Sequence, residues 1–313
     1  MTRYPPDRFG LIRREAARAT DIADDHLRAA VRAGDLLRLI PGVFVESSDD
    51  FAGHAGEDAL YRLRCIAVAT SELTGETPPP LSFDSAAAMH GLPLLRSDRN
   101  RVHVTNGRLA GGSVRRYRHT HAGMWTPAEL DVVDGIRVTS LERTAVDVAM
   151  AGTFAQGLTA FDGAIRAGAD RATMADMCGR RRRQGIATAR RALAAADPLS
   201  ASVGESWSRA QMIEGGLPLP RLQREYRCGT KTYEVDFDWE GRMVGEFDGK
   251  KKYVTLRRPG ESAEDAVMRE KVREDQLSAL GVKVIRWTWA VLEKHGLVAL
   301  LRPWLLQFGL LAA

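Results

Sequence analysis

The sequence has few cysteines and no long apolar run. Its three cysteines, Cys65, Cys178 and Cys228, fit no zinc-ligand spacing and cannot all pair with one another. The most apolar stretch, 297–311, is interrupted by charged residues and a proline, whereas a membrane span needs roughly 20 apolar residues. The N-terminus lacks the apolar core of a signal peptide. We therefore expect a cytoplasmic protein that does not enter a membrane.

Motifs for small-molecule cofactors are also missing. The sequence contains no phosphate-binding loop, no dinucleotide-binding fingerprint and no hydrolase nucleophile elbow. His119 and His121 lie two residues apart and could share a metal ion, but the sequence offers no evident third ligand. We therefore expect no small-molecule cofactor.

Composition and charge describe a globular protein of several domains. The chain has 313 residues, of which 44% are hydrophobic and 27% are charged, with a net charge of +5. This length suits two or three domains, and the positive charge is compatible with a nucleic-acid partner without requiring one. The expected fold class is α+β or α/β, with domains at 1–50, 51–198 and 199–313.

The first domain is predicted to be a winged helix. Two short helices precede Gly34, with Ile12 in the first and Asp24 or Asp25 capping the second, and a hairpin turns at Pro41. Predicted DNA-binding residues are Arg28, Arg32 and Arg38; the first two lie one turn apart on the second helix and point away from its apolar stripe. The alternative is a helical hairpin whose arginines are simply solvated.

The middle domain is predicted to be mixed α/β and to end in a basic segment. Strands are expected at 101–104 and 113–118, and a capping box at Thr139 opens a helix. The most concentrated positive charge is the run Arg180, Arg181, Arg182 and Arg183. This run is either a solvated face or a surface that follows DNA phosphates without sequence choice.

The third domain carries a cluster of acidic residues on a predicted hairpin, with strands at 232–239 and 243–248. Glu246 and Asp248 share one face, Lys250 follows on that face if the strand continues, and Asp236 is their cross-strand partner. Adjacent carboxylates repel, and a bound Mg²⁺ or Mn²⁺ would remove the repulsion and activate water. The same acids could instead form surface salt bridges with nearby lysines and arginines.

The order helix, hairpin, helix, strand, helix favours the metal site, because it is that of the PD-(D/E)xK restriction-endonuclease fold. Over residues 199–295 the motifs Glu246-x-Asp248-Gly-Lys250 and Leu280-Gly-x-x-Val284-Ile-Arg-Trp287 resemble relatives of the very-short-patch-repair endonucleases. The resemblance implies a restriction-endonuclease-like α/β domain with Asp236 and Glu246 as metal ligands and Glu205 as a supporting acid. Asp248 stands where that fold usually has its catalytic lysine, and Lys250 lies one same-face position later.

The front of the chain resembles a different family. The segment Arg38-Leu-Ile-Pro-Gly-Val-Phe44, together with Ala87–Pro93 and Val138–Asp147, is similar to the antitoxins of type IV toxin–antitoxin systems, the AbiEi-like family. The resemblance implies autorepression through DNA binding and a possible cognate toxin.

Two functions follow from these patterns. The main hypothesis is a Mg²⁺-dependent endonuclease acting on double-stranded DNA in defence, mobile-element or repair biology, with Glu205, Asp236, Glu246, Asp248 and Lys250 as its catalytic residues. The alternative is an antitoxin-like transcriptional regulator whose nuclease-like domain is catalytically silent.

Overall fold

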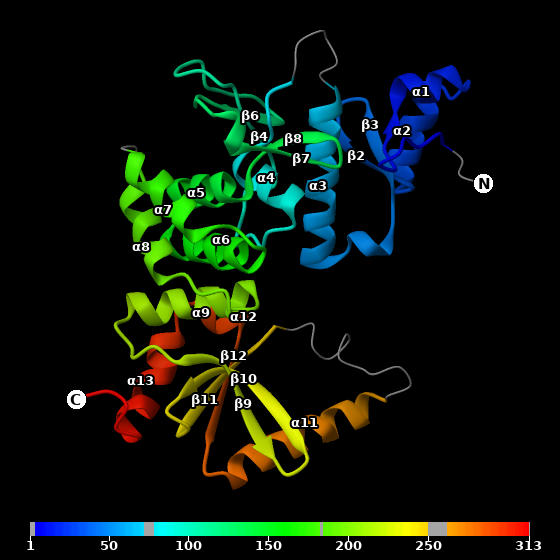
Figure 1. The fold of residues 1–313 in the computed structure, drawn as a ribbon. Coiled ribbons are helices and arrows are strands. Elements are labelled where there is room, and N and C mark those ends of the chain that lie inside the picture. Colours follow the sequence, from blue (N-terminus) through cyan, green and yellow to red (C-terminus); the bar gives the residue numbers. More distant parts are fainter. Residues whose placement is uncertain (1–3, 72–77, 182–183, 250–261, 313) are drawn as a thin grey trace. The chain divides into compact units, whose positions relative to one another are not determined.

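The computed structural model describes residues 4–71, 78–181, 184–249 and 262–312. It is a mixed α/β protein with several small sheets (Figure 1), as expected from the sequence. The chain divides into unit 1, residues 1–148 and 172–177, and unit 2, residues 149–171 and 178–313. The prediction of three domains stays a prediction. No helix within the described ranges is long and apolar enough to cross a membrane.

Unit 1 begins with two helices and a three-stranded sheet. The elements are β1 (Ile12–Arg13), α1 (Arg14–Ala19), α2 (Asp24–Ala33), β2 (Leu36–Ile40) and β3 (Val43–Glu46), and the strand order is β1-β3-β2. Leu27, Ala30 and Phe44 belong to the small core beneath these elements.

Local chemistry explains where these helices begin and end. Gly34 ends α2 with φ of 84°, as predicted, because glycine has no Cβ to clash in the left-handed region. Two local predictions were wrong. Ile12 pairs with Phe44 in the sheet instead of starting the first helix, and the N-cap of α2 is Ala23, so Asp24 and Asp25 lie in the first turn.

The remainder of unit 1 places helices against short strands. The elements are η1 (Asp49–Phe51), α3 (Gly53–Ser71), α4 (Phe83–His90), β4 (Val102–Thr105), β5 (Ser113–Val114), β6 (Arg118–His121), η2 (Pro127–Glu129), β7 (Leu130–Val133), β8 (Ile136–Thr139) and α5 (Leu141–Ala151). The β4-β6-β5 sheet and the β7-β8 pair are linked by the fully buried Leu81, which bridges to Val104 and Val138.

Two further predictions in unit 1 needed correction. Residues 113–118 do not form one strand, since β5 and β6 are separate strands that turn back on each other. The helix after β8 is capped by Ser140, whose Oγ accepts the Arg143 backbone N–H, while the Thr139 hydroxyl bonds Thr144 instead.

Unit 2 begins with helices, two of which are joined by a buried carboxylate. The helices are α6 (Phe154–Arg166), α7 (Arg171–Arg180), of which 172–177 belong to unit 1, α8 (Ile186–Ala195) and α9 (Val203–Glu214). Asp162 of α6 is fully buried and accepts bonds from Arg209 (2.9 Å), Ser206 (2.8 Å) and the backbone of Asp197 (2.7 Å). These bonds satisfy the charge and join α6 to α9.

A four-stranded sheet completes unit 2. Strands β9 (Arg221–Cys228), β10 (Lys231–Trp239) and β11 (Met243–Asp248) are antiparallel neighbours, and β12 (Lys283–Thr288) runs parallel to β11. The remaining helices are α11 (Ala263–Ala279), α12 (Trp289–Glu293) and α13 (Leu297–Gln307). The hairpin, the Ser262 capping box, α11 and β12 follow the predicted order, but β9 was not predicted.

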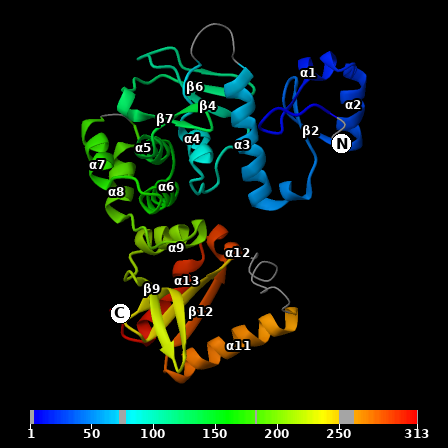
Figure 2. The ribbon, with the colours of Figure 1, turned by 45° about the vertical axis from the view of Figure 1, so that its right-hand side comes forward.

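The two faces of this sheet have different partners, as Figure 2 shows. On one face, Val235 and Val244 pack with Leu277 of α11. On the other, the Trp287 Nε1–H donates to Ser208 Oγ of α9 at 2.8 Å. Gly204 of α9 lies so close to the Phe247 ring that a Cβ there would come within 2.0 Å of it. The sheet and α9 therefore form one tightly packed layer pair.

Candidate nucleic-acid interface

The three arginines predicted to bind DNA in the first domain come together in unit 1. Arg28 and Arg32 of α2 and Arg38 of β2 line one surface pocket, which Arg14 also lines. The other lining residues are Asp24, Leu27, Val31 and Phe44. Three elements, α1, α2 and β2, thus place four arginine side chains around one pocket.

These arginines differ in how they are paired. Arg28 forms an exposed ion pair with Asp25 at 2.6 Å, and that hydrogen bond raises its pKa. Arg14 lies 3.8 Å from Asp24. Arg32 and Arg38 are exposed, and no carboxylate among the described residues pairs with either. At least two positive charges at this pocket are therefore not neutralised by any carboxylate that the structure describes.

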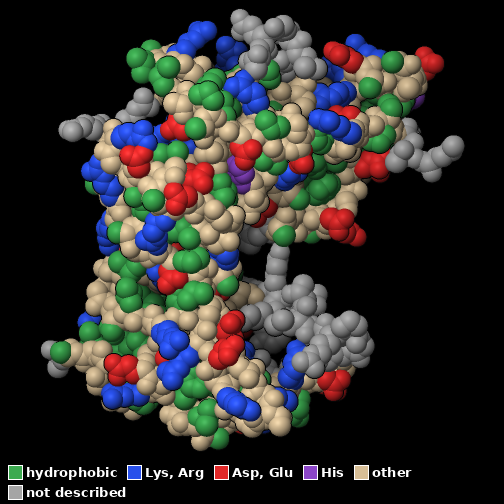
Figure 3. Space-filling view, in the orientation of Figure 1, with side chains coloured by type: hydrophobic (Ala, Val, Ile, Leu, Met, Phe, Trp, Pro, Cys, Tyr) green, Lys and Arg blue, Asp and Glu red, His purple; other side chains and the backbone are tan. Residues whose placement is uncertain are grey.

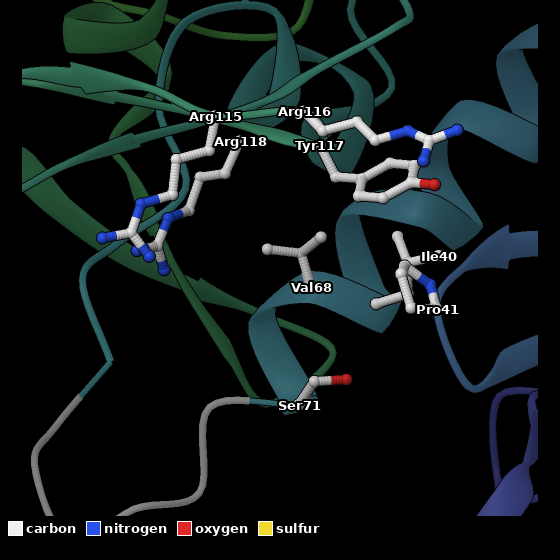
Figure 4. Close-up of a pocket in the computed structure, with 8 residues that line it drawn as sticks. All are labelled: Ile40, Pro41, Val68, Ser71, Arg115, Arg116, Tyr117 and Arg118. Carbon is white, nitrogen blue, oxygen red and sulfur yellow. The ribbon is translucent and has the colours of Figure 1, made fainter.

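A second basic pocket adjoins the first. Its rim carries Arg115, Arg116 and Arg118, and Val68, Ile40 and Pro41 form its apolar part (Figure 4). In Figure 4, Arg115 and Arg118 extend to the same side. The guanidinium carbon of Arg116 lies 5.1 Å from the centroid of the Tyr117 ring.

Arg38 connects the two pockets. Its Nη2 donates to the Tyr117 hydroxyl at 3.4 Å, and this bond lowers the Tyr117 pKa. On the face drawn in Figure 3, Lys and Arg are interspersed with Asp and Glu. The two linked pockets, which we call the arginine surface, are therefore the candidate interface. We define this surface by Arg14, Arg28, Arg32, Arg38, Arg115, Arg116, Tyr117 and Arg118.

The sequence patterns did not identify five residues of this surface, Arg14, Arg115, Arg116, Tyr117 and Arg118. A signal was present in Ser113-Val-Arg-Arg-Tyr-Arg118, where three arginines flank an aromatic residue. That segment was interpreted only as a strand. Its proximity to β2 depends on contacts across the fold that spacing along the chain does not reveal.

The arginine run at the end of α7 is described only in part. Arg180 is exposed and Arg181 is half-buried, whereas Arg182 and Arg183 lie outside the described residues. The two arginines beyond the run pack within unit 2. Arg190 donates to the Cys178 carbonyl at 2.8 Å, and Arg191 stacks 4.1 Å from the Phe154 ring. Phosphate binding by the run stays a prediction.

Glu246, a predicted metal ligand, is buried between two arginines. Its carboxylate forms two ion pairs. Oε1 lies 2.5 Å from Nη2 of Arg273 in α11, and Oε2 lies 3.2 Å from Nε of Arg286 in β12. The two arginines therefore neutralise the negative charge of Glu246, which a bound metal ion would neutralise in the predicted metal site. Asp236, the second predicted ligand, accepts the Phe247 backbone N–H at 2.8 Å through Oδ2.

The other predicted catalytic residues have different surroundings. Glu205 is buried at the start of α9, where it accepts bonds from Ser202 (2.7 Å), the Ala201 backbone (2.8 Å) and Gln223 (3.0 Å). Asp248 is half-buried, and its Oδ1 has no hydrogen-bond partner within the described part of the chain. Lys250 lies outside the described residues.

The described acids of this set do not lie close enough together to form a compact ligand set. Among the described residues, no three of them place carboxylate oxygens within 4.8 Å of one another. Mg²⁺ prefers several oxygens at about 2.1 Å, so the arrangement as it stands does not fit that ion. The magnesium site and its five catalytic residues stay a prediction from the sequence.

Part of the chain is similar to a known protein family. Residues 81–195, just over a third of the chain, match the AbiEi antitoxin C-terminal domain. The match confirms the antitoxin resemblance for the middle region, and it includes the basic strands β5 and β6. It does not extend to the N-terminal segment or to residues 199–313.

Two similar proteins come from Mycobacterium tuberculosis. They are the uncharacterized proteins MT2308 of strain CDC 1551 and Rv2248 of strain H37Rv. Each is 28% identical to this chain over 267 residues, which cover 83% of this chain and 88% of the relative. The similarity therefore spans both units.

Proposed function

We propose that this protein is a DNA-binding regulator of the antitoxin type, and that it contacts double-stranded DNA through the arginine surface of unit 1. The observation that carries the proposal is the joining of two arginine-lined pockets through Arg38 and Tyr117. The match of residues 81–195 to an antitoxin domain supports the same conclusion.

The N-terminal elements suit this role if they form a winged helix. Helices α1 and α2 followed by the β2–β3 hairpin have the required order, and β1 adds the third strand. Arg28 and Arg32 are four residues apart and share a face of α2, the helix that would enter the major groove. Arg38, Arg115 and Arg116 would then contact the flanking phosphates, which fixes orientation but not sequence.

An antitoxin also implies a toxin. We infer a cognate protein toxin as a second partner, on the strength of the family match alone. The basic run that includes Arg180 and Arg181 remains a further candidate for phosphate contact.

A metal-dependent nuclease is the second candidate function. Asp248 favours it, because one of its carboxylate oxygens is buried and has no hydrogen-bond partner among the described residues. Such an oxygen is costly unless something binds it. In that hypothesis Asp236 and Glu246 bind Mg²⁺ or Mn²⁺, Glu205 supports them and Lys250 orients water. We infer the regulator instead, because Arg273 and Arg286 already neutralise Glu246.

One experiment separates these functions. The protein is incubated with a supercoiled plasmid carrying the DNA upstream of its own coding sequence, in Mg²⁺, in Mn²⁺ or in EDTA. The regulator predicts retarded but uncut DNA in all three conditions, with a scrambled duplex bound more weakly. Metal-dependent cleavage that is lost in Asp236→Ala would establish the nuclease. Absence of any DNA binding would remove both functions.

A further inference from the structure

Three histidines of unit 1 lie close together on the sheet formed by β4, β6 and β5. β4 and β6 are parallel, with His103 opposite His119 and Thr105 opposite His121. One nitrogen of each of the three imidazoles lies within 4.8 Å of the others. The third histidine, which the spacing of His119 and His121 did not reveal, is therefore supplied by strand pairing.

The rings form a half-buried stack. His103 Nδ1 and His121 Nε2 are 2.8 Å apart, and the centroids of the His119 and His121 rings are separated by 3.9 Å. The Phe83 ring stacks on His121 with a centroid distance of 3.9 Å. This aromatic cover limits solvent on one side of the cluster and leaves His119 the most accessible of the three.

Two buried polar atoms at the cluster have no hydrogen-bond partner within the part of the chain that the structure describes. The Nε2 of His103 is buried, and no described residue forms a hydrogen bond with it. The Thr105 side chain shares the His103 face of β4, since side chains alternate along a strand. Its hydroxyl is also buried and has no hydrogen-bond partner among the described residues. An ordered water molecule beside the cluster would satisfy such atoms.

The electrostatic surroundings keep the imidazoles neutral. Burial, followed by the charge of His119, lowers the pKa of His103 to about 4. Burial, followed by His119 and His103, lowers the pKa of His121 to about 3. Burial, followed by the charge of Arg101, lowers the pKa of His119. The charge of Asp98 acts in the opposite direction and raises the pKa of both His103 and His119. Neutral imidazole is the form that binds metals.

We propose that His103, His119 and His121 bind one divalent transition-metal ion, with Zn²⁺ the best fit and a fourth position left for water. Imidazole nitrogens suit zinc, nickel and copper but not Mg²⁺ or Ca²⁺. Two nitrogens bound tetrahedrally at about 2.0–2.1 Å from zinc would lie roughly 3.3 Å apart. The His103–His121 pair need open by only about 0.5 Å from its 2.8 Å separation. This site goes beyond the proposed DNA-binding function and does not depend on it.

The test is calorimetric titration of the full chain, without a histidine tag and stripped with EDTA, using ZnCl₂. CoCl₂ serves as a second probe, because its visible absorption reports tetrahedral ligands. We expect one saturable site per chain, at least tenfold weaker in His119→Ala and unchanged in His26→Ala. His26 is an exposed histidine of α2 outside the cluster.

Folding of each variant is checked by circular dichroism, and His119→Gln replaces His119→Ala if the latter does not fold. Zinc binding of equal strength in wild type and the His119 variant would overturn the proposal. So would the absence of saturable binding to the wild-type chain, or a loss of binding in His26→Ala equal to that in the His119 variant.

Discussion

Removal of the Glu246 carboxylate should destabilise unit 2 strongly. The side chain is 4% exposed and contacts two guanidinium groups whose side chains are 19% and 31% exposed. Glu246→Ala leaves both arginines without their carboxylate in a partly buried setting. Breaking a fully buried ion pair costs about 3–5 kcal/mol, and solvent access of the arginines reduces that figure. We expect unfolding to become easier by about 2–4 kcal/mol.

Urea denaturation followed by tryptophan fluorescence measures this change, because Trp239 and Trp287 are buried in the same sheet. Glu225→Ala, at an exposed position of β9, is the matched control and should change stability by less than about 0.5 kcal/mol. Glu246→Gln should fall between the two, since an amide keeps a hydrogen-bond acceptor but not the charge.

Two results would refute this reasoning. One is a Glu246→Ala variant as stable as the control. The other is stabilisation of the wild type by millimolar Mg²⁺ that disappears in Glu246→Ala, because a ligand that binds only the folded state raises stability. The second result would mean that the carboxylate serves a metal and not the two arginines.

Three further substitutions probe ionisable side chains that are buried or half-buried, each by urea or thermal unfolding. Asp162→Ala should cost about 3–5 kcal/mol, because it leaves the buried Arg209 unpaired; no loss would contradict the network. Burial raises the pKa of Asp84 to about 6, so its charged form is penalised above that pH. Asp84→Asn should therefore stabilise the protein by about 1–3 kcal/mol at pH 7, with the gain vanishing as pH falls toward 4. His121 has the opposite sign: the unfolded chain takes up its proton near pH 6.5 and the folded chain only near pH 3. Stability is therefore lost as pH falls from 7 to 5, and His121→Asn should reduce that loss by about 1–2 kcal/mol. An unchanged pH profile would count against a His121 side chain that stays neutral in the folded protein.

Local signals predicted many elements of the fold. Gly34, the Pro41 turn and the Ser202 and Ser262 caps act through neighbouring backbone atoms, so their effect can be read along the chain. β9 escaped prediction because Arg224 interrupts its alternation of apolar residues. The structure pairs that arginine with the buried Asp238 at 2.8 Å, a contact that no local pattern encodes.

The candidate sites depended more on long-range contacts. The alternation of Glu246 and Asp248 was visible in the sequence, but the arginines that neutralise Glu246 lie 27 and 40 residues further along the chain. His103 likewise reaches His119 only through parallel pairing of strands β4 and β6. Residue types were therefore predictable, whereas their partners and charge balance were not.

The most direct test of DNA binding by the arginine surface is a fluorescence-anisotropy titration of labelled duplex, from upstream of the protein's own coding sequence, over a range of salt concentrations. The double variant Arg32→Ala/Arg38→Ala is compared with wild type and with Arg227→Ala, an exposed arginine of β9 in unit 2. Each phosphate contact contributes about 0.9 to the slope of log K against log salt. We predict a slope smaller by about 1.8 and binding about 30-fold weaker near 0.15 M salt for the double variant, with Arg227→Ala unchanged. Equal affinity and equal slope in all three proteins would contradict the account.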